Sequence, residues 1–207
     1  MPPEALAQLI APVHTVLVTQ ECQNGVLGDR AIFPQLAEAA RTEMIPNAAR
    51  LVKAARATGV QVVHCLALRR EDAKGSNTNA RLFGAVAKAP IHLTPGTAAA
   101  NVIPEIGVEA GDIVLTRFHG VGPMAGTDLD PVLRNLRAKT IVGVGVSVNV
   151  GMTNFVMDAV NIGYRFVLPR DAVAGVPADC AEAVIENTLS LLATVVRTED
   201  VMKAWQQ

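Results

Sequence analysis

The chain has 207 residues, of which 50% are hydrophobic and 18% are charged, and its 18 Lys and Arg nearly balance its 19 Asp and Glu. This composition excludes the disordered and fibrous classes, and the lack of a Lys/Arg block argues against a nucleic-acid-binding surface. Because only 3% of the residues are aromatic, the core must consist of Val, Ala, Ile and Leu, which favours a parallel sheet covered by helices.

Six apolar runs along the chain are typical of buried strands, and helical patterns separate them. Each pair of strands is far enough apart in sequence for a crossover connection. The order predicts one α/β domain over residues 1–207, with three α/β/α layers and a six-stranded, mostly parallel, doubly wound sheet. The predicted strands cover residues 14–19, 60–68, 112–117, 140–146, 165–168 and 194–196, and the last clear helix covers 179–192.

Five residues mark the starts, breaks and ends of the predicted helices between the strands. Pro34 is expected to begin a helix, Pro46 to interrupt or restart it, and Gly59 to end it directly before the second strand. Asn149 is expected to cap a helix that stops at Gly163. The long segment 69–111 shows no regular pattern and is the predicted place for a lid or for subunit contacts.

The residues that follow the strands are the candidate site, because ligands of doubly wound sheets bind at the carboxyl ends of the strands. Glu21 follows the first strand, Arg117 ends the third, and residues 146–151 follow the fourth. Glu21 is either a functional carboxylate or a helix cap or structural ion pair, and position alone does not separate these. Arg117 is interpreted as the cation that pairs with it.

A cofactor is not indicated by the motifs. Gly120-x-Gly122-x-x-Ala125 formally fits a dinucleotide-binding fingerprint, but Pro123 lies where backbone N–H groups should face phosphates, and the next strand ends without an acidic residue. The four histidines form no metal-binding pairs, and His119 is the one that we place near a site. We therefore expect neither a cofactor nor a metal.

The cysteines and the N-terminal segment favour a cytoplasmic protein. Cys22, Cys65 and Cys180 are widely spaced and form no CxxC or Cys/His pattern, which argues against disulfides and a zinc site. The N-terminus lacks the regions of a signal peptide, and the longest apolar stretch, 140–150, is too short to span a bilayer. We expect no membrane partner.

Several segments together resemble the isochorismatase-like (cysteine hydrolase) superfamily from about Thr15 to Leu192. Their order and spacing agree with that family, which implies its fold. The segments are TVLVTQECQN at 15–24, DIVLTR at 112–117, GTDLD at 126–130, GVGVSVNVGM at 143–152 and RDAVAG at 170–175.

The resemblance places Glu21, Arg117 and Gly151 at the positions where the family typically has a catalytic Asp, Lys and Cys. In the amidase branch the Cys thiolate attacks a carbonyl carbon, which Gly151 cannot do because it has no side chain. Isochorismatases proper have a small residue there, and their carboxylic acid protonates an enol ether. The resemblance also implies a non-proline cis peptide bond between Val146 and Ser147.

We expect Glu21, Arg117 and the segment 146–151 to line one pocket. The leading hypothesis is a hydrolase of a small molecule that needs no cysteine, with Glu21 as general acid or base and Arg117 as its electrostatic partner or as an anion clamp. The alternative is an inactive family member that binds a small ligand or has a structural role, and a third hypothesis gives Cys22 the catalytic role. The resemblance implies a homo-oligomer. Further substrate contacts are expected from Gln23, Phe118, His119 and Phe155.

Overall fold

Seven strands form one sheet at the centre of the computed structural model, which describes residues 2–206. Six lie in the order β3-β2-β1-β4-β5-β7, the two-residue strand β6 pairs with β4, and every pairing is parallel. The predicted fold class is confirmed, with one short strand more than expected. The strands are β1 Thr15–Gln20, β2 Gln61–Ala67, β3 Ile113–Arg117, β4 Thr140–Val146, β5 Arg165–Pro169, β6 Val173–Ala174 and β7 Thr194–Val196.

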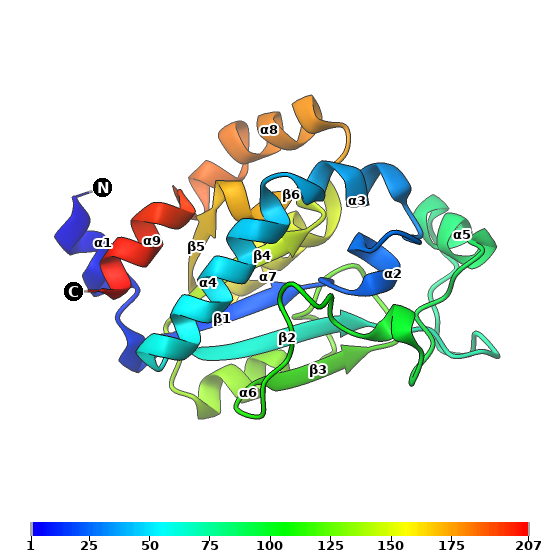
Figure 1. Cartoon of the computed structure of the whole chain (residues 1–207), viewed down its shortest axis with the longest axis horizontal. Helices are drawn as coiled ribbons and strands as arrows, with labels where there is room; N and C mark the ends of the chain where they lie inside the picture. The colour runs from blue at the N-terminus through cyan, green and yellow to red at the C-terminus, as the bar shows by residue number, and fades with distance from the viewer. Residues whose placement is uncertain (1, 207) are drawn as a thin grey trace.

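Helices cover both faces of this sheet, with α4 in front and α7 behind in Figure 1. Each face buries its own apolar cluster, because successive side chains of a strand point to opposite faces. In β1, Leu17 joins the cluster with α4, whereas Val16 and Val18 join the cluster with α7. The helices are α1 Pro3–Leu9, α2 Asn24–Leu27, α3 Pro34–Arg41, α4 Met44–Thr58, α5 Arg81–Lys88, α6 Leu129–Asn135, α7 Thr153–Asn161, α8 Ala178–Asn187 and α9 Thr198–Trp205.

The helix boundaries confirm some of the predicted signals and correct others. Pro34 begins α3, and Gly59 ends α4 with a φ of +76°. The helix restarts at Pro46, one of the two expected outcomes: α3 ends at Arg41, and Pro46 lies in the first turn of α4, where a missing backbone N–H leaves no hydrogen bond unmade. Asn149 is not a helix cap: it lies inside the π-helix Val148–Met152 that precedes α7.

Two further predictions are corrected by the tertiary structure. The predicted helix 179–192 ends early: α8 stops at Asn187, and a 3-10 turn follows. In that turn Leu189 is buried, whereas Leu191 is 80% exposed. The segment 69–111, in which no regular element was predicted, contains α5.

A buried polar network holds the start of β3 against the sheet. The carboxylate of Asp112 accepts hydrogen bonds from Arg56 Nη2 at 2.5 Å and from His64 Nε2 at 3.2 Å. His64 is fully buried, and its Nδ1 lies 2.8 Å from the hydroxyl of Thr19. Burial lowers the pKa of His64, against the opposing effect of Asp112. His64 therefore has a structural role.

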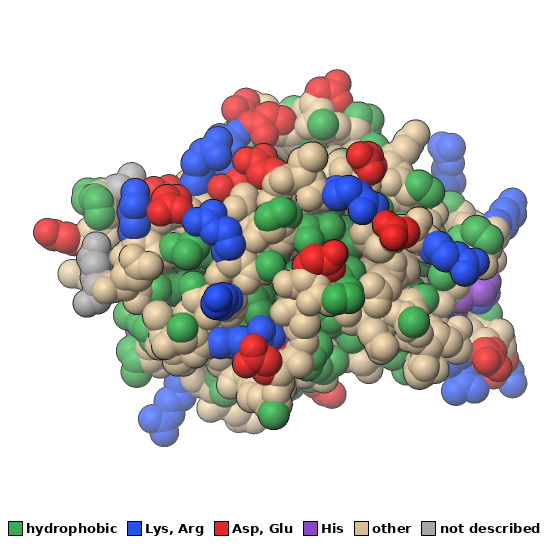
Figure 2. Space-filling view, in the orientation of Figure 1, with side chains coloured by type: hydrophobic (Ala, Val, Ile, Leu, Met, Phe, Trp, Pro, Cys, Tyr) green, Lys and Arg blue, Asp and Glu red, His purple; other side chains and the backbone are tan. Residues whose placement is uncertain are grey.

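The surface shows no segregation of charge on the face drawn in Figure 2, where basic and acidic side chains are interspersed among apolar ones. Within residues 2–206, no helix combines the length and the apolar character needed to cross a membrane.

Candidate functional site

A cavity of about 500 Å³ lies at the carboxyl ends of the central strands. Its lining includes the residues that follow four neighbouring strands: Glu21 after β1, Leu68 after β2, Phe118 after β3 and Ser147 after β4. Between β1 and β4 the strand order changes direction, which is where doubly wound sheets bind ligands. The volume is in the range of small-molecule sites, about 300–1,000 Å³.

Glu21 leaves the end of β1 with an unusual backbone conformation. Its φ is +54°, in the left-handed region that residues other than glycine seldom adopt. Its backbone N–H donates to the carbonyl of Cys65 at 2.9 Å, and the residues on both sides, Gln20 and Cys22, are fully buried. This conformation costs on the order of 1 kcal/mol and is typical of functional sites. The carboxylate lies in the cavity lining with 22% of the side chain exposed.

Arg117 lies at the end of β3, and its Nη2 donates a hydrogen bond to the Glu21 carboxylate. Its side chain is only 4% exposed. Within the described residues 2–206, neither Nε nor Nη1 of this guanidinium has a hydrogen-bond partner. A guanidinium stays protonated in proteins, so Arg117 and Glu21 form an ion pair in the cavity lining. The other two nitrogen atoms of Arg117 can still donate hydrogen bonds. The structure places the two predicted partners in contact.

The connection from β4 to α7 forms another wall of the cavity. The peptide bond between Val146 and Ser147 is cis, as the resemblance implies. Gly151 lies in the π-helix that follows, and a Cβ atom added to it would lie 2.3 Å from Nε2 of Gln20 and 2.9 Å from the carbonyl oxygen of Val121. Gln20 is fully buried. Its amide therefore occupies the space into which a side chain at position 151 would project.

We expect Gly151→Ala to lower the free energy of unfolding by about 1–3 kcal/mol, the usual cost of overpacking a filled site. The matched control is Gly111→Ala, because no atom lies within 4 Å of a Cβ atom at Gly111, and it should stay within about 0.5 kcal/mol of the wild type. Urea unfolding measures both. Equal stabilities of the two variants would show that Gln20 does not occupy the space that a side chain at position 151 needs.

Two of the expected substrate contacts lie in the cavity lining. Phe118 is 37% exposed there. His119 is an exposed lining residue, and its Nε2 lies 3.2 Å from the carbonyl oxygen of Gly126. Because a carbonyl oxygen only accepts, Nε2 carries the proton in this contact. Nδ1 is then the ring nitrogen that can accept a hydrogen bond from a ligand.

The other two expected contacts do not lie in the cavity lining, which corrects the sequence-based expectation. Gln23 is fully buried, and its Nε2 donates to the carbonyls of Ala67 and Ala100, both at 2.9 Å. Phe155 is fully buried in α7 and packs edge-on against Phe166, with 5.0 Å between the ring centroids. Backbone groups of two other segments hold the Gln23 amide, and Phe155 lies on the side of α7 that packs against the sheet.

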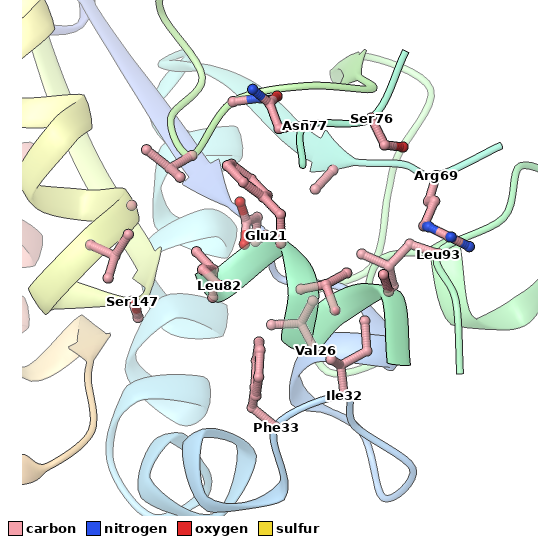
Figure 3. Close-up of a pocket in the computed structure, with 18 of the residues that line it drawn as sticks. Glu21, Val26, Ile32, Phe33, Arg69, Ser76, Asn77, Leu82, Leu93 and Ser147 are labelled. Atoms are coloured by element: carbon pink, nitrogen blue, oxygen red, sulfur yellow. The ribbon is translucent and has the colours of Figure 1, made fainter. Parts of the chain in front are cut away.

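The apolar wall of the cavity was missed by the sequence analysis. Much of it comes from α5 and from the chain before and within α3, and Figure 3 shows side chains from these segments around the space beside Glu21. The available signal was the helical spacing of Leu82, Phe83 and Val86 inside the segment 69–111. The apolar lining residues include Val26, Ile32, Phe33, Leu36, Leu68, Leu82, Phe83, Val86, Leu93, Val121, Val150 and Val176.

The cysteines offer no activated thiol at the cavity. Cys22 and Cys65 are buried and lie outside the cavity lining. Burial raises the pKa of each thiol to about 12, and for Cys22 the charge of Glu21 adds to this effect. The thiolate is the nucleophilic form, so both thiols are inert at neutral pH. Within the described part of the chain, no group of three or more His, Cys, Asp or Glu residues could hold a metal ion.

Comparison with known proteins gives a consistent result. The sequence profile of the isochorismatase domain matches residues 15–200. An uncharacterized isochorismatase family protein of Bacillus subtilis is 31% identical over 104 residues, which cover 50% of this chain and 54% of that protein. The matched region is thus little more than half the length of that curated relative.

Solved structures share the whole architecture. The structure of an isochorismatase family protein from Burkholderia thailandensis is 25% identical, with a TM-score of 0.77 over 94% of this chain and 97% of that one. The N-carbamoylsarcosine amidase of Thermoplasma acidophilum is also 25% identical, with a TM-score of 0.71 over 90% of this chain and 97% of that one.

Proposed function

Because the chain belongs to the isochorismatase family, we propose that it is a hydrolase of a small molecule that works without a cysteine nucleophile. The observation that carries this proposal is the Glu21–Arg117 ion pair in the cavity lining, beside a glycine at position 151. With the amide of Gln20 in the place of a side chain at that position, Glu21 is the residue best placed to transfer a proton.

The proposed reaction is hydrolysis of an enol ether or of a related C–O or C–N bond. For an enol ether, the protonated Glu21 carboxyl gives its proton to the double-bond carbon, and a water molecule adds to the oxocarbenium carbon that results. The hemiketal then separates into a carbonyl compound and an alcohol, and the proton that the water released returns to Glu21. One water molecule is consumed, and no covalent enzyme intermediate forms.

Arg117 and Gly151 have supporting roles in this scheme. The guanidinium stabilises the carboxylate that Glu21 becomes after it gives up its proton, and it acts in a site of low exposure, where such electrostatic interactions are strong. The remaining N–H groups of Arg117 can bind an anionic or carbonyl oxygen of the substrate. Gly151 has no side chain, so the amide of Gln20 can occupy the space next to it.

The alternative function, binding of a small ligand without turnover, is favoured by one observation. Glu21 and Arg117 already satisfy each other's charge, as the partners of a structural ion pair do. In that case the cavity would retain its ligand unchanged.

An assay against enol ethers, amides and esters tests the proposal, with Cys22→Ser as the comparison variant. We expect the wild type to hydrolyse a member of the panel and Cys22→Ser to retain the wild-type kcat/KM, because the thiol is buried and protonated. The absence of turnover across the panel would favour the binding function. Loss of activity in Cys22→Ser, with the fold intact, would instead assign catalysis to that thiol.

A further inference from the structure

Helix α5 lies at the periphery of the fold, at the right of Figure 1 beyond the ends of the strands. None of its residues is fully buried. Among the described residues, it makes no extensive packing contact with another helix or strand. The cavity is the place where its apolar side chains gather.

The apolar side of α5 is turned toward the same space as Glu21. Leu82 and Val86, one turn apart and therefore on one face of the helix, both line the cavity, and Phe83 lines it beside them. Figure 3 draws Leu82 and Glu21 among the side chains that line this one cavity. On the same helix, Ala85 is exposed and does not line the cavity.

An eight-residue helix is not stable by itself in water, and its stability in a protein comes from burying its apolar face. For α5 that face meets a cavity of about 500 Å³, and apolar side chains from other parts of the chain, Ile32, Phe33 and Leu93, contribute to the same lining. A ligand with an apolar body would displace water both from α5 and from the apolar side chains that face it. It would give α5 the van der Waals contacts that other helices obtain from the packed core.

We propose that α5 is the element that selects the substrate, and that the substrate carries an apolar body that packs against Leu82 and Val86 while its reacting polar group reaches Glu21. Only the part of the inference that brings the polar group of the substrate to Glu21 rests on the proposed function. It assigns the substrate to the class of small amphiphiles, and it makes α5 a binding helix that becomes more rigid when the substrate is bound.

The test uses 1-butanol, 1-hexanol and 1-octanol as probes, because they carry a small polar end and an apolar chain but no bond to hydrolyse. Titration calorimetry on the full chain should show affinity rising about fourfold for each added methylene group, as expected for burial of a CH₂ group. Hydrogen exchange of the backbone amides of residues 81–88 should slow when 1-octanol is bound.

Variants on α5 locate the binding surface. Leu82→Ser and Val86→Ser should each weaken 1-octanol binding by about tenfold or more, whereas Ala85→Ser, on the exposed side of the same helix, should leave it unchanged. Because α5 packs loosely, the variants should keep the unfolding transition of the wild type, which circular dichroism checks.

Two results would overturn the inference. One is an affinity that does not depend on chain length or is equal in the three serine variants. The other is protection of residues 81–88 that grows with protein concentration in the absence of alcohol, which would assign the apolar face to a second copy of this chain. Failure of the hydrolase proposal would give a different result. The affinity for the alcohols would still depend on chain length, but no compound of the substrate panel would be hydrolysed.

Discussion

Glu21→Gln is expected to lower kcat/KM by about 10²–10⁴-fold on the substrate that the wild type hydrolyses, the usual contribution of a proton-transferring side chain. The amide cannot donate a carboxylic proton or accept one at neutral pH, although its carbonyl oxygen can still accept the hydrogen bond from Arg117. The cavity should therefore keep its shape, so that the loss falls on kcat more than on KM.

The matched control for this variant is Glu105→Gln, because Glu105 is exposed and lies outside the cavity lining. It makes the same chemical change away from the site and should retain the wild-type kcat/KM. Retention of more than a tenth of the activity in Glu21→Gln would rule out Glu21 as the general acid or base.

The free energy of unfolding should fall by about 3–5 kcal/mol in Glu21→Ala, the cost of leaving one partner of a buried ion pair without the other. Arg117 is 4% exposed, and two of its nitrogen atoms already lack a partner within residues 2–206. Removing the carboxylate would take away the interaction that compensates its charge. Guanidinium chloride unfolding monitored by circular dichroism measures this change.

The reverse substitution, Arg117→Met, should destabilise the protein less. The Glu21 side chain is 22% exposed, so water can solvate the carboxylate that remains. The double variant Glu21→Ala/Arg117→Met should be more stable than the sum of the single effects predicts, because no buried charge is left behind. Additive single effects, or a loss below about 1 kcal/mol in Glu21→Ala, would contradict a coupled pair.

The strands were predictable because they lie inside a sheet that helices cover on both faces. The run 140–146 is apolar without alternation and forms β4 with the predicted bounds. Residues at the ends of neighbouring parallel strands meet at one edge of the sheet, so Glu21 and Arg117 could be assigned to one place from sequence.

The direction of individual side chains at that edge was not predictable in the same way. Gln23 follows β1 as Phe118 follows β3, yet the side chain of Gln23 is buried in the core, whereas Phe118 lies in the cavity lining. The reason is that side-chain direction beyond a strand depends on the turn that follows. At Glu21 the backbone of that turn is left-handed. A glutamate in the sequence does not predict this conformation.

The sequence by itself determined the class of fold, the family resemblance and the residue types that follow each strand, because hydrophobic periodicity and motif spacing are local properties of the chain. Only the tertiary structure decided that the amide of Gln20 fills the space next to Gly151 and that Leu82 and Val86 of α5 form a wall of the cavity. These contacts join segments far apart in the chain, and they are set by how closely the packed elements approach one another.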